Sequence, residues 1–148
     1  MQLMEFRSLH TRRVCVLKVH VPVSAATLAR LAAGDADAMA EAPALSAILA
    51  IIRETDPLGD FGAYRSVVEL SLGWEMFTPA PAARPSLGAA GIESHSPTVI
   101  LHVHLPAEGR AEIETAIARI VDAHPWEVPV IEIASADLIV ASPQASEP

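Results

Sequence analysis

The order of strand and helix patterns along the chain constrains its fold more than any other feature of the sequence. Strand patterns are runs rich in Val, Ile and Leu that alternate with other residues, whereas helical patterns place apolar residues three or four positions apart. The strand patterns cover 13–21, 65–72, 98–105 and 128–134, and the helical patterns cover 25–33 and 107–123. This order predicts an α+β, ferredoxin-like βαββαβ fold with an antiparallel four-stranded sheet. Right-handed crossovers would place the helices on one face and leave the other face uncovered.

Alternation within two strands assigns side chains to the two faces of this sheet. The apolar face carries Leu17, Val19 and Val21 from the first strand and Val99, Leu101, Val103 and Leu105 from the third. The opposite face carries Lys18, His20, Ile100, His102 and His104. Because the first and third strands are neighbours in this fold, we expect His20, His102 and His104 to lie near one another on the uncovered face.

The remaining stretches define the domain organisation. Residues 1–12 lack a clear period and predict an N-terminal extension, 13–142 predict a single domain, and 143–148 predict a disordered tail. An Ala-rich stretch, 35–53, enlarges the first helical region. Its first ten residues predict an insertion, a frayed turn or a second short helix, and the rest has the apolar content of a buried helix.

Composition excludes some classes of partner. The 148 residues include 10 Lys and Arg against 18 Asp and Glu, and the net charge is −8. Nucleic acids and anionic membranes bind basic patches, so neither is an expected partner. The single cysteine, Cys15, allows no intramolecular disulfide and favours a reducing compartment. With no signal-like start and no apolar run near the ~20 residues of a spanning helix, we expect a cytoplasmic protein.

Six residues join the last helix to the last strand: His124-Pro125-Trp126-Glu127-Val128-Pro129, here called the HPWE segment. The segment resembles the His-Pro-aromatic-Glu-x-Pro ending of CutA divalent-cation-tolerance proteins and of the insert domain in many Nif-three-like (YqfO-type) proteins. The second resemblance is broader and covers roughly residues 13–135. The loop signature of that insert is similar to Gly62-x-Tyr64, Gly73, Phe77-x-Pro79, Ala83-x-Pro85, Gly88 and Gly91.

This resemblance implies a PII/CutA-like fold that assembles as a homotrimer, in a free-standing version of the insert. The chain is too short for the dinuclear-metal core of the parent family. The resemblance implies no enzymatic role, because the function of the insert itself is regulatory or concerned with assembly. Two departures stand out in this sequence. The first helical region is enlarged, and the glutamate doublet that follows the aromatic residue in the insert is Glu127-Val128 here.

The histidines of the uncovered face are the first candidates for chemistry. Three histidines with one carboxylate form a reasonable ligand set for a divalent metal such as zinc, copper or nickel. The histidines are His20, His102 and His104, and the carboxylate is Glu69 or Glu132. The alternative is structural: a trimer buries this face and the histidines hydrogen-bond within it. Strand histidine pairs are a weak signature compared with a closed ligand motif.

His124 and Glu127 are the second candidates. They form either a metal-ligand pair or an acid and base at a subunit cleft. In the structural alternative, His124 caps the last carbonyls of the helix, Pro125 ends it, and Trp126 packs on the sheet or on a neighbouring subunit. A single histidine and glutamate lack the orienting third group of a catalytic site, so the structural alternative is favoured.

The predicted long loop, 73–96, contains Pro79, Pro81, Pro85 and three glycines. Loops of this length are usually functional or concerned with assembly. The apolar side chains Trp74, Met76 and Phe77 favour contact with another subunit, and a protein partner or effector is the alternative.

Three functions follow from these features. The first is a non-enzymatic PII/CutA-like trimer of regulatory or metal-ion-binding type. The second is a structural assembly or adaptor module without a ligand, and the third is an enzyme that uses His124 and Glu127 in a subunit cleft.

Overall fold

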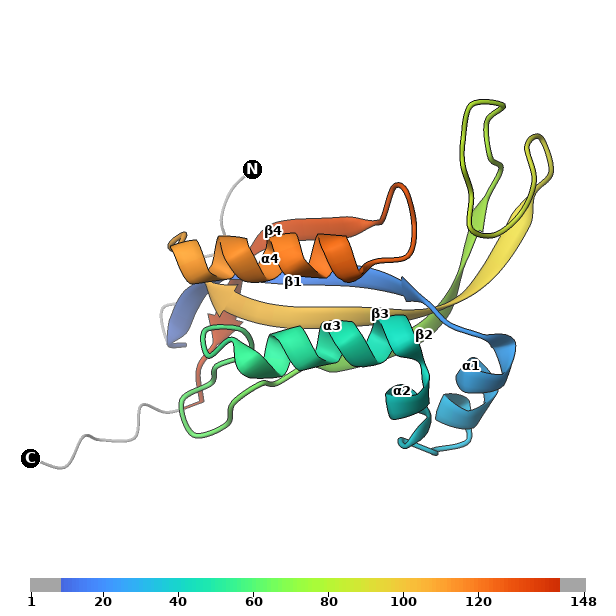
Figure 1. The fold of residues 1–148 in the computed structure, drawn as a ribbon. Coiled ribbons are helices and arrows are strands. Elements are labelled where there is room, and N and C mark those ends of the chain that lie inside the picture. The colour runs from blue at the N-terminus through green and yellow to red at the C-terminus, as the bar shows by residue number, and fades with distance from the viewer. Residues whose placement is uncertain (1–8, 142–148) are drawn as a thin grey trace, which may run out of the picture.

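A computed structural model describes residues 9–141 of the chain, which form one sheet and four helices (Figure 1). The strands are β1 (Thr11–Pro22), β2 (Glu69–Phe77), β3 (Ser94–Pro106) and β4 (Ile131–Ile139). The helices are α1 (Ala25–Ala32), α2 (Ala38–Glu41), α3 (Pro43–Glu54) and α4 (Ala111–Ala123). The predicted tail, 143–148, and most of the predicted N-terminal extension fall outside these residues.

The four strands form an antiparallel sheet in the order β2-β3-β1-β4. The prediction of an α+β fold with a four-stranded antiparallel sheet is therefore confirmed. The element order departs from a simple βαββαβ pattern, because three helices rather than one connect β1 to β2. The short helix α2 shows which alternative holds for the Ala-rich stretch: residues 38–41 form a second helix.

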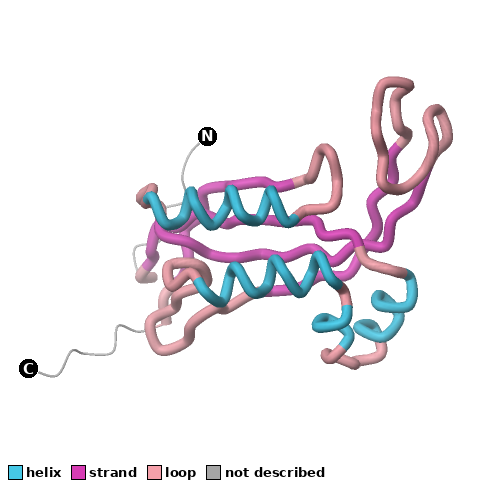
Figure 2. Tube along the Cα trace, viewed as in Figure 1, coloured by secondary structure: helices cyan, strands magenta, loops and turns pink. Residues whose placement is uncertain are grey.

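The hydrophobic core lies between the sheet and the helices α3 and α4, which run along one face of it (Figure 2). From the sheet it contains Leu17, Val19, Val21, Val99, Leu101, Val103 and Leu105, as the alternation predicts. From the helices it contains Leu45, Ile48, Leu49, Ile51, Ile52, Ile113, Ala116 and Ile120. Burial of each large aliphatic side chain contributes about 1.5–3 kcal/mol, so this layer dominates the stability of the fold.

Local signals explain where α1 begins and ends. The hydroxyl oxygen of Ser24 accepts a hydrogen bond from the backbone N–H of Thr27 at 3.0 Å, which satisfies one free donor at the start of the helix. Gly34, with a φ of +88°, follows the last turn. Arg30 then pairs with Asp35, at 2.7 Å, and with Glu41, and so connects α1 to α2.

Several predicted boundaries are wrong. Strand β1 begins at Thr11, so the last residues of the predicted extension belong to the sheet. Strand β2 reaches Phe77 and β3 begins at Ser94, so the predicted 73–96 loop is confined to residues 78–93. Gly73 suggested a strand end, but it pairs with Thr98 inside the ladder, and the side chain of Ile100 lies over it.

Two further boundaries differ on either side of the HPWE segment. Helix α4 begins at Ala111 rather than at 107, because Arg110 has an extended backbone with φ −130° and ψ 145°. Strand β4 begins at Ile131 rather than at 128, because Pro129 has no N–H to donate to a ladder. The strand continues through Asp137, which pairs with Arg13 at 3.0 Å.

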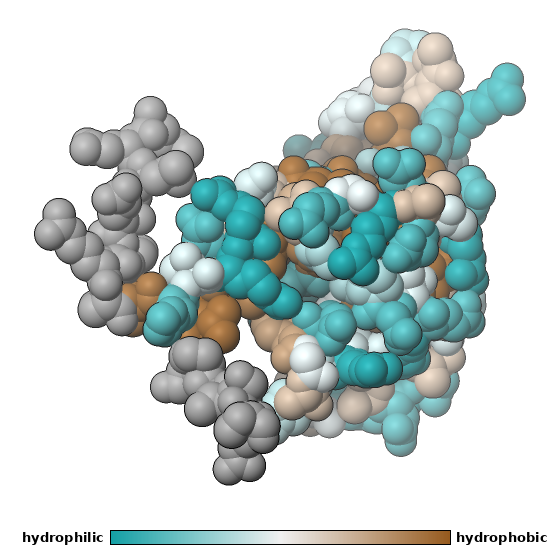
Figure 3. All heavy atoms as spheres, turned by 90° about the vertical axis from the view of Figure 1, so that its left-hand side faces the viewer, coloured by the Kyte–Doolittle hydropathy of each residue, from teal (hydrophilic) through white to brown (hydrophobic). Residues whose placement is uncertain are grey.

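The two ends of the molecule differ in character. The end at which α4 begins presents mostly hydrophilic side chains (Figure 3). At the other end the β2–β3 hairpin extends past the helices and carries the loop 78–93 (Figure 1).

Across residues 9–141, every helix is too short or too polar to cross a membrane.

Candidate ligand-binding pocket

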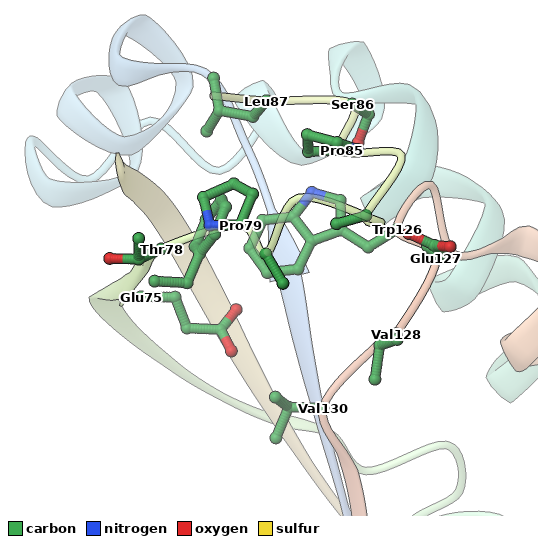
Figure 4. A pocket seen from close by; sticks show the side chains of 13 residues that line it. Glu75, Thr78, Pro79, Pro85, Ser86, Leu87, Trp126, Glu127, Val128 and Val130 are labelled. Carbon is green, nitrogen blue, oxygen red and sulfur yellow. The ribbon is translucent and has the colours of Figure 1, made fainter. Parts of the chain in front are cut away.

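A pocket of ≈ 350 Å³ opens between the β2–β3 hairpin and the HPWE segment (Figure 4). Three stretches supply its walls: the outer half of β2, the loop 78–93, and residues 126–130. Its lining residues are Glu75, Phe77, Thr78, Pro79, Ala80, Ala83, Pro85, Ser86, Leu87, Trp126, Glu127, Val128 and Val130. Stretches that are far apart in the sequence thus meet around one cavity, whose size suits a small molecule.

Most of the wall is apolar. The rings of Phe77 and Trp126 meet edge to face, with their centroids 5.3 Å apart. Pro79 is buried beside them. Trp126 therefore does pack against other side chains, as the structural alternative predicts, but it also presents part of its indole to the cavity (Figure 4).

Glu75 brings a carboxylate to this apolar surface. Alternation along β2 places Glu75 on the same face of the sheet as Glu69, the face that the helices leave uncovered. Its side chain is only 18% exposed. The Oε2 atom is buried without a hydrogen-bond partner, and burial raises the pKa of the carboxyl above its ordinary value.

His20 is a titratable neighbour of Glu75 on the same face of the sheet. Nδ1 of the ring lies 3.7 Å from Oε1 of Glu75, which is too long for a hydrogen bond. Both ring nitrogens are buried without a partner. Burial and the ammonium of Lys18 lower the pKa of His20, while Glu132 opposes this shift. Both pKa shifts favour the neutral forms of the side chains. His20 therefore gives the carboxylate of Glu75 neither a hydrogen bond nor a strong opposite charge.

His124 holds the HPWE segment against the sheet. Its Nε2 atom lies 2.6 Å from the backbone oxygen of His20, and its Nδ1 atom accepts the backbone N–H of Trp126 at 3.1 Å. Because Nδ1 accepts, the proton is on Nε2, which donates to His20. Burial lowers the pKa of His124, and the hydrogen bond to His20 opposes this shift. The predicted capping of helix carbonyls by this side chain is wrong, since the ring reaches across to β1.

Glu127 has a different role from that of His124. Its Oε2 atom accepts the backbone N–H of Arg84 at 2.9 Å and so ties the loop 78–93 to the HPWE segment. Glu127 lines the pocket, whereas His124 does not. The two residues predicted as a ligand pair or an acid and base thus make separate contacts and do not converge on a shared site.

The three histidines of the uncovered face come only partly together. His102 lies opposite Lys18, whose ammonium is 3.6 Å from the carboxylate of Glu132. His20 lies two residues beyond Lys18 along β1 and is opposite Ile100. His104 packs edge to face on Phe61, with their centroids 5.4 Å apart. Among residues 9–141, no group of three or more His, Cys, Asp and Glu side chains is placed to hold a metal ion.

Sequence reasoning found Trp126 and Glu127 but missed Glu75. The boundary predicted at Gly73 placed Glu75 in a loop, where alternation carries no information. Continuing the period of two past this glycine places Glu69, Ser71 and Glu75 on the face of His102, as the strand register has it. The place of Glu75 on that face, beside the already predicted Glu69, was therefore detectable from the sequence.

Comparison with known proteins bears on the fold. No family model matches the chain, and no curated protein matches it. Among solved structures, a Bacillus cereus protein related to NIF3 is similar, with a TM-score of 0.50 and 18% sequence identity over 90% of this chain. The match covers 27% of that protein, so this chain spans about a quarter of its length. The comparison shows that the chain has the fold of one part of a NIF3-related protein.

Proposed function

We propose that this chain is a non-enzymatic regulatory module that binds a small effector in the pocket beside Trp126. In this proposal its fold is of the PII/CutA type, built on a ferredoxin-like sheet, and the chain is a free-standing version of the insert domain of Nif-three-like proteins. One observation carries the binding role: an apolar pocket is lined by Glu75, a largely buried carboxylate whose Oε2 atom has no hydrogen-bond partner. Such a group costs stability unless something that binds there uses it.

The contacts of His124 support binding over catalysis. A general base needs a free nitrogen within reach of the substrate, and both ring nitrogens of His124 make hydrogen bonds within the fold. Glu127 is also engaged, through the N–H of Arg84. An enzyme that uses these two residues would first have to break contacts that hold the HPWE segment and the loop in place.

Assembly as a homotrimer is a second part of the proposal. The face of β2 opposite Glu75 carries an apolar stripe: Leu70, Leu72, Trp74 and Met76 are 38%, 42%, 61% and 67% exposed. Exposed aromatic and methionine side chains are enriched in subunit interfaces. The stripe supports contact between subunits through the hairpin, and a different protein partner is the alternative.

Fragment binding followed by nuclear magnetic resonance tests the binding role. We expect at least one small apolar fragment to shift the indole N–H of Trp126 and the amides of Val128 and Glu75. The indole signal is assigned from a Trp126→Phe variant. If a broad fragment set leaves these signals unmoved while the chain remains folded, the pocket is not a ligand site and the proposal fails.

A divalent metal ion, zinc or copper, is a second candidate ligand. It is favoured by one observation, the two unpartnered ring nitrogens of His20 beside Glu75. Equilibrium dialysis with Zn²⁺ or Cu²⁺ tests it, and we expect stoichiometric uptake that His20→Ala abolishes. Uptake that persists unchanged in His20→Ala and in His102→Ala/His104→Ala would remove this candidate.

A further inference from the structure

The charge of the pocket sets a condition on its ligand. Two carboxylates, Glu75 and Glu127, are among the thirteen lining residues, and none of the thirteen is Lys, Arg or His. An anionic ligand would meet no opposite charge in these walls and would lie near two like charges. The electrostatics therefore disfavour carboxylates and phosphates as ligands.

The two carboxylates differ in their hydrogen-bond partners. Glu127 is exposed and already accepts the N–H of Arg84 at 2.9 Å. Glu75 has one oxygen with no partner and the other 3.7 Å from an imidazole that burial makes a weak base. Its carboxylate extends towards the centre of the pocket (Figure 4). A positively charged donor placed in the pocket beside Oε1, the less buried of the two oxygens, would supply a charge-assisted hydrogen bond that the fold itself does not provide.

The walls around Glu75 add a second condition. Trp126 and Phe77 present aromatic surface, and Pro79, Val128 and Val130 extend the apolar lining. Aromatic faces attract organic cations and bury apolar groups. A hydrated inorganic cation would leave this surface unused, whereas a molecule with both a charged group and an apolar body would use all of it.

We propose that this pocket binds a small organic cation, with an ammonium group against Glu75 and an apolar or aromatic body against Trp126 and Phe77. This inference rests on the proposed function and names the chemical class of the effector. Glu75 is the specificity-determining residue, because it is the buried group that separates a cation from a neutral molecule of the same shape.

Three probes with one body but different charge test the inference: benzylammonium, benzyl alcohol and benzoate. The fluorescence of Trp126 reports binding in a Trp74→Phe background, which removes the other of the two tryptophans. We expect benzylammonium to bind about tenfold or more tightly than benzyl alcohol, and benzoate to bind most weakly. The preference should weaken at high salt, because part of it is charge attraction.

The variant Glu75→Gln keeps the shape of the side chain and removes its charge. We expect it to weaken benzylammonium binding about tenfold and to leave benzyl alcohol binding unchanged, which also shows that the pocket is intact. Glu69→Gln is the matched control: it makes the same charge change on the same strand and face but outside the pocket, and it should retain the full preference.

The outcomes separate this inference from the proposed function. If the three probes bind equally, if benzoate binds best, or if Glu127→Gln rather than Glu75→Gln removes the preference, the assignment of an organic cation to Glu75 is overturned and the pocket remains a ligand site. If none of the probes binds and fragments also leave Trp126 unmoved, both proposals fail.

Discussion

The ring of His124 donates a hydrogen bond from Nε2 to the backbone oxygen of His20, 2.6 Å away, across 104 positions of sequence. The same ring accepts the N–H of Trp126. One buried imidazole thus joins β1 to the segment that forms a wall of the pocket. Its removal should affect both stability and the position of Trp126.

The first prediction concerns this imidazole. His124→Ala leaves a partly buried carbonyl and a partly buried N–H without partners, at a cost of about 1–2 kcal/mol each, so we expect a loss of about 2–4 kcal/mol in the free energy of unfolding. His124→Gln keeps one donor and one acceptor and should lose less. Urea denaturation of both variants measures the difference. Equal losses would show that His124 stabilises the fold through packing rather than through hydrogen bonding.

The second prediction is a pH dependence. Burial lowers the pKa of His124 below its ordinary value of 6.5, so the unfolded chain takes up this proton at higher pH than the folded chain. The stability supplied by neutral His124 is therefore complete above about pH 7 and declines as the pH falls through 6.5. Burial and Lys18 shift His20 in the same direction, against Glu132.

Urea denaturation at several pH values between about 7 and 5 measures this decline. His124→Gln cannot titrate and should show a shallower decline than the natural chain. A variant that keeps the full decline would assign the effect to His20 or to another group.

The third prediction concerns Glu75. Burial raises the pKa of its carboxyl above the ordinary 4.5, so the unfolded chain releases this proton first, and stability is lost as the pH rises above 4.5. Glu75→Gln should therefore have a higher melting temperature than the natural chain at neutral pH, with a smaller gain near pH 4. Glu69→Gln, at an exposed position of the same strand, should leave the melting temperature nearly unchanged. A lower melting temperature for Glu75→Gln at neutral pH would show that the charged carboxylate stabilises the fold, contrary to the raised pKa.

The fourth prediction concerns assembly through the apolar stripe of β2. Placing a charge in an apolar interface leaves it unpaired, so Trp74→Glu/Met76→Glu should convert an oligomer into a monomer of 15.6 kDa. Tyr64→Glu is the control, because Tyr64 is 75% exposed but lies outside the strand. Multi-angle light scattering measures the mass. An unchanged oligomer, or a natural chain that is already monomeric, would refute assembly through this stripe.

The fifth prediction concerns Gly59. Its φ is +70°, and a Cβ there would overlap the backbone of Val67, so Gly59→Ala should cost about 1–3 kcal/mol. Gly109→Ala is the matched control, because a Cβ at that position meets open space, and it should change stability by less than about 0.5 kcal/mol. Thermal unfolding of the two variants separates them.

Much of the fold was predictable because its signals are local. The period of two in 98–105 placed Val99, Leu101, Val103 and Leu105 in the core, where they lie. Ser24 marked the start of α1 through a hydrogen bond to a residue three positions on. The pairing of the first and third strands followed from the order of elements and was confirmed by the register of β1 and β3.

The pocket was not predictable in the same way, because its walls come from stretches joined only in three dimensions. Gly73 hid the continuation of β2, since a glycine ends many strands and only the pairing with Thr98 shows that this one does not. The role of His124 depends on a carbonyl of β1, which has no sequence signature. The metal set of His20, His102 and His104 stays a prediction. Alternation along a strand predicts which face of the sheet a side chain points from, but not whether several side chains meet at one point.

The hairpin ladder closes with Phe77 opposite Ser94, so the loop 78–93 leaves and re-enters the sheet at facing positions. The loop wall of the pocket is thus attached to a sheet that is complete without it, while Glu75 lies in β2 and Trp126 lies in the HPWE segment. Lengthening, shortening or rewriting the loop would leave the strand register and the buried core untouched. Changes in this loop, natural or engineered, can therefore alter the size and shape of the molecule that the pocket accepts, while the carboxylate of Glu75 stays in place.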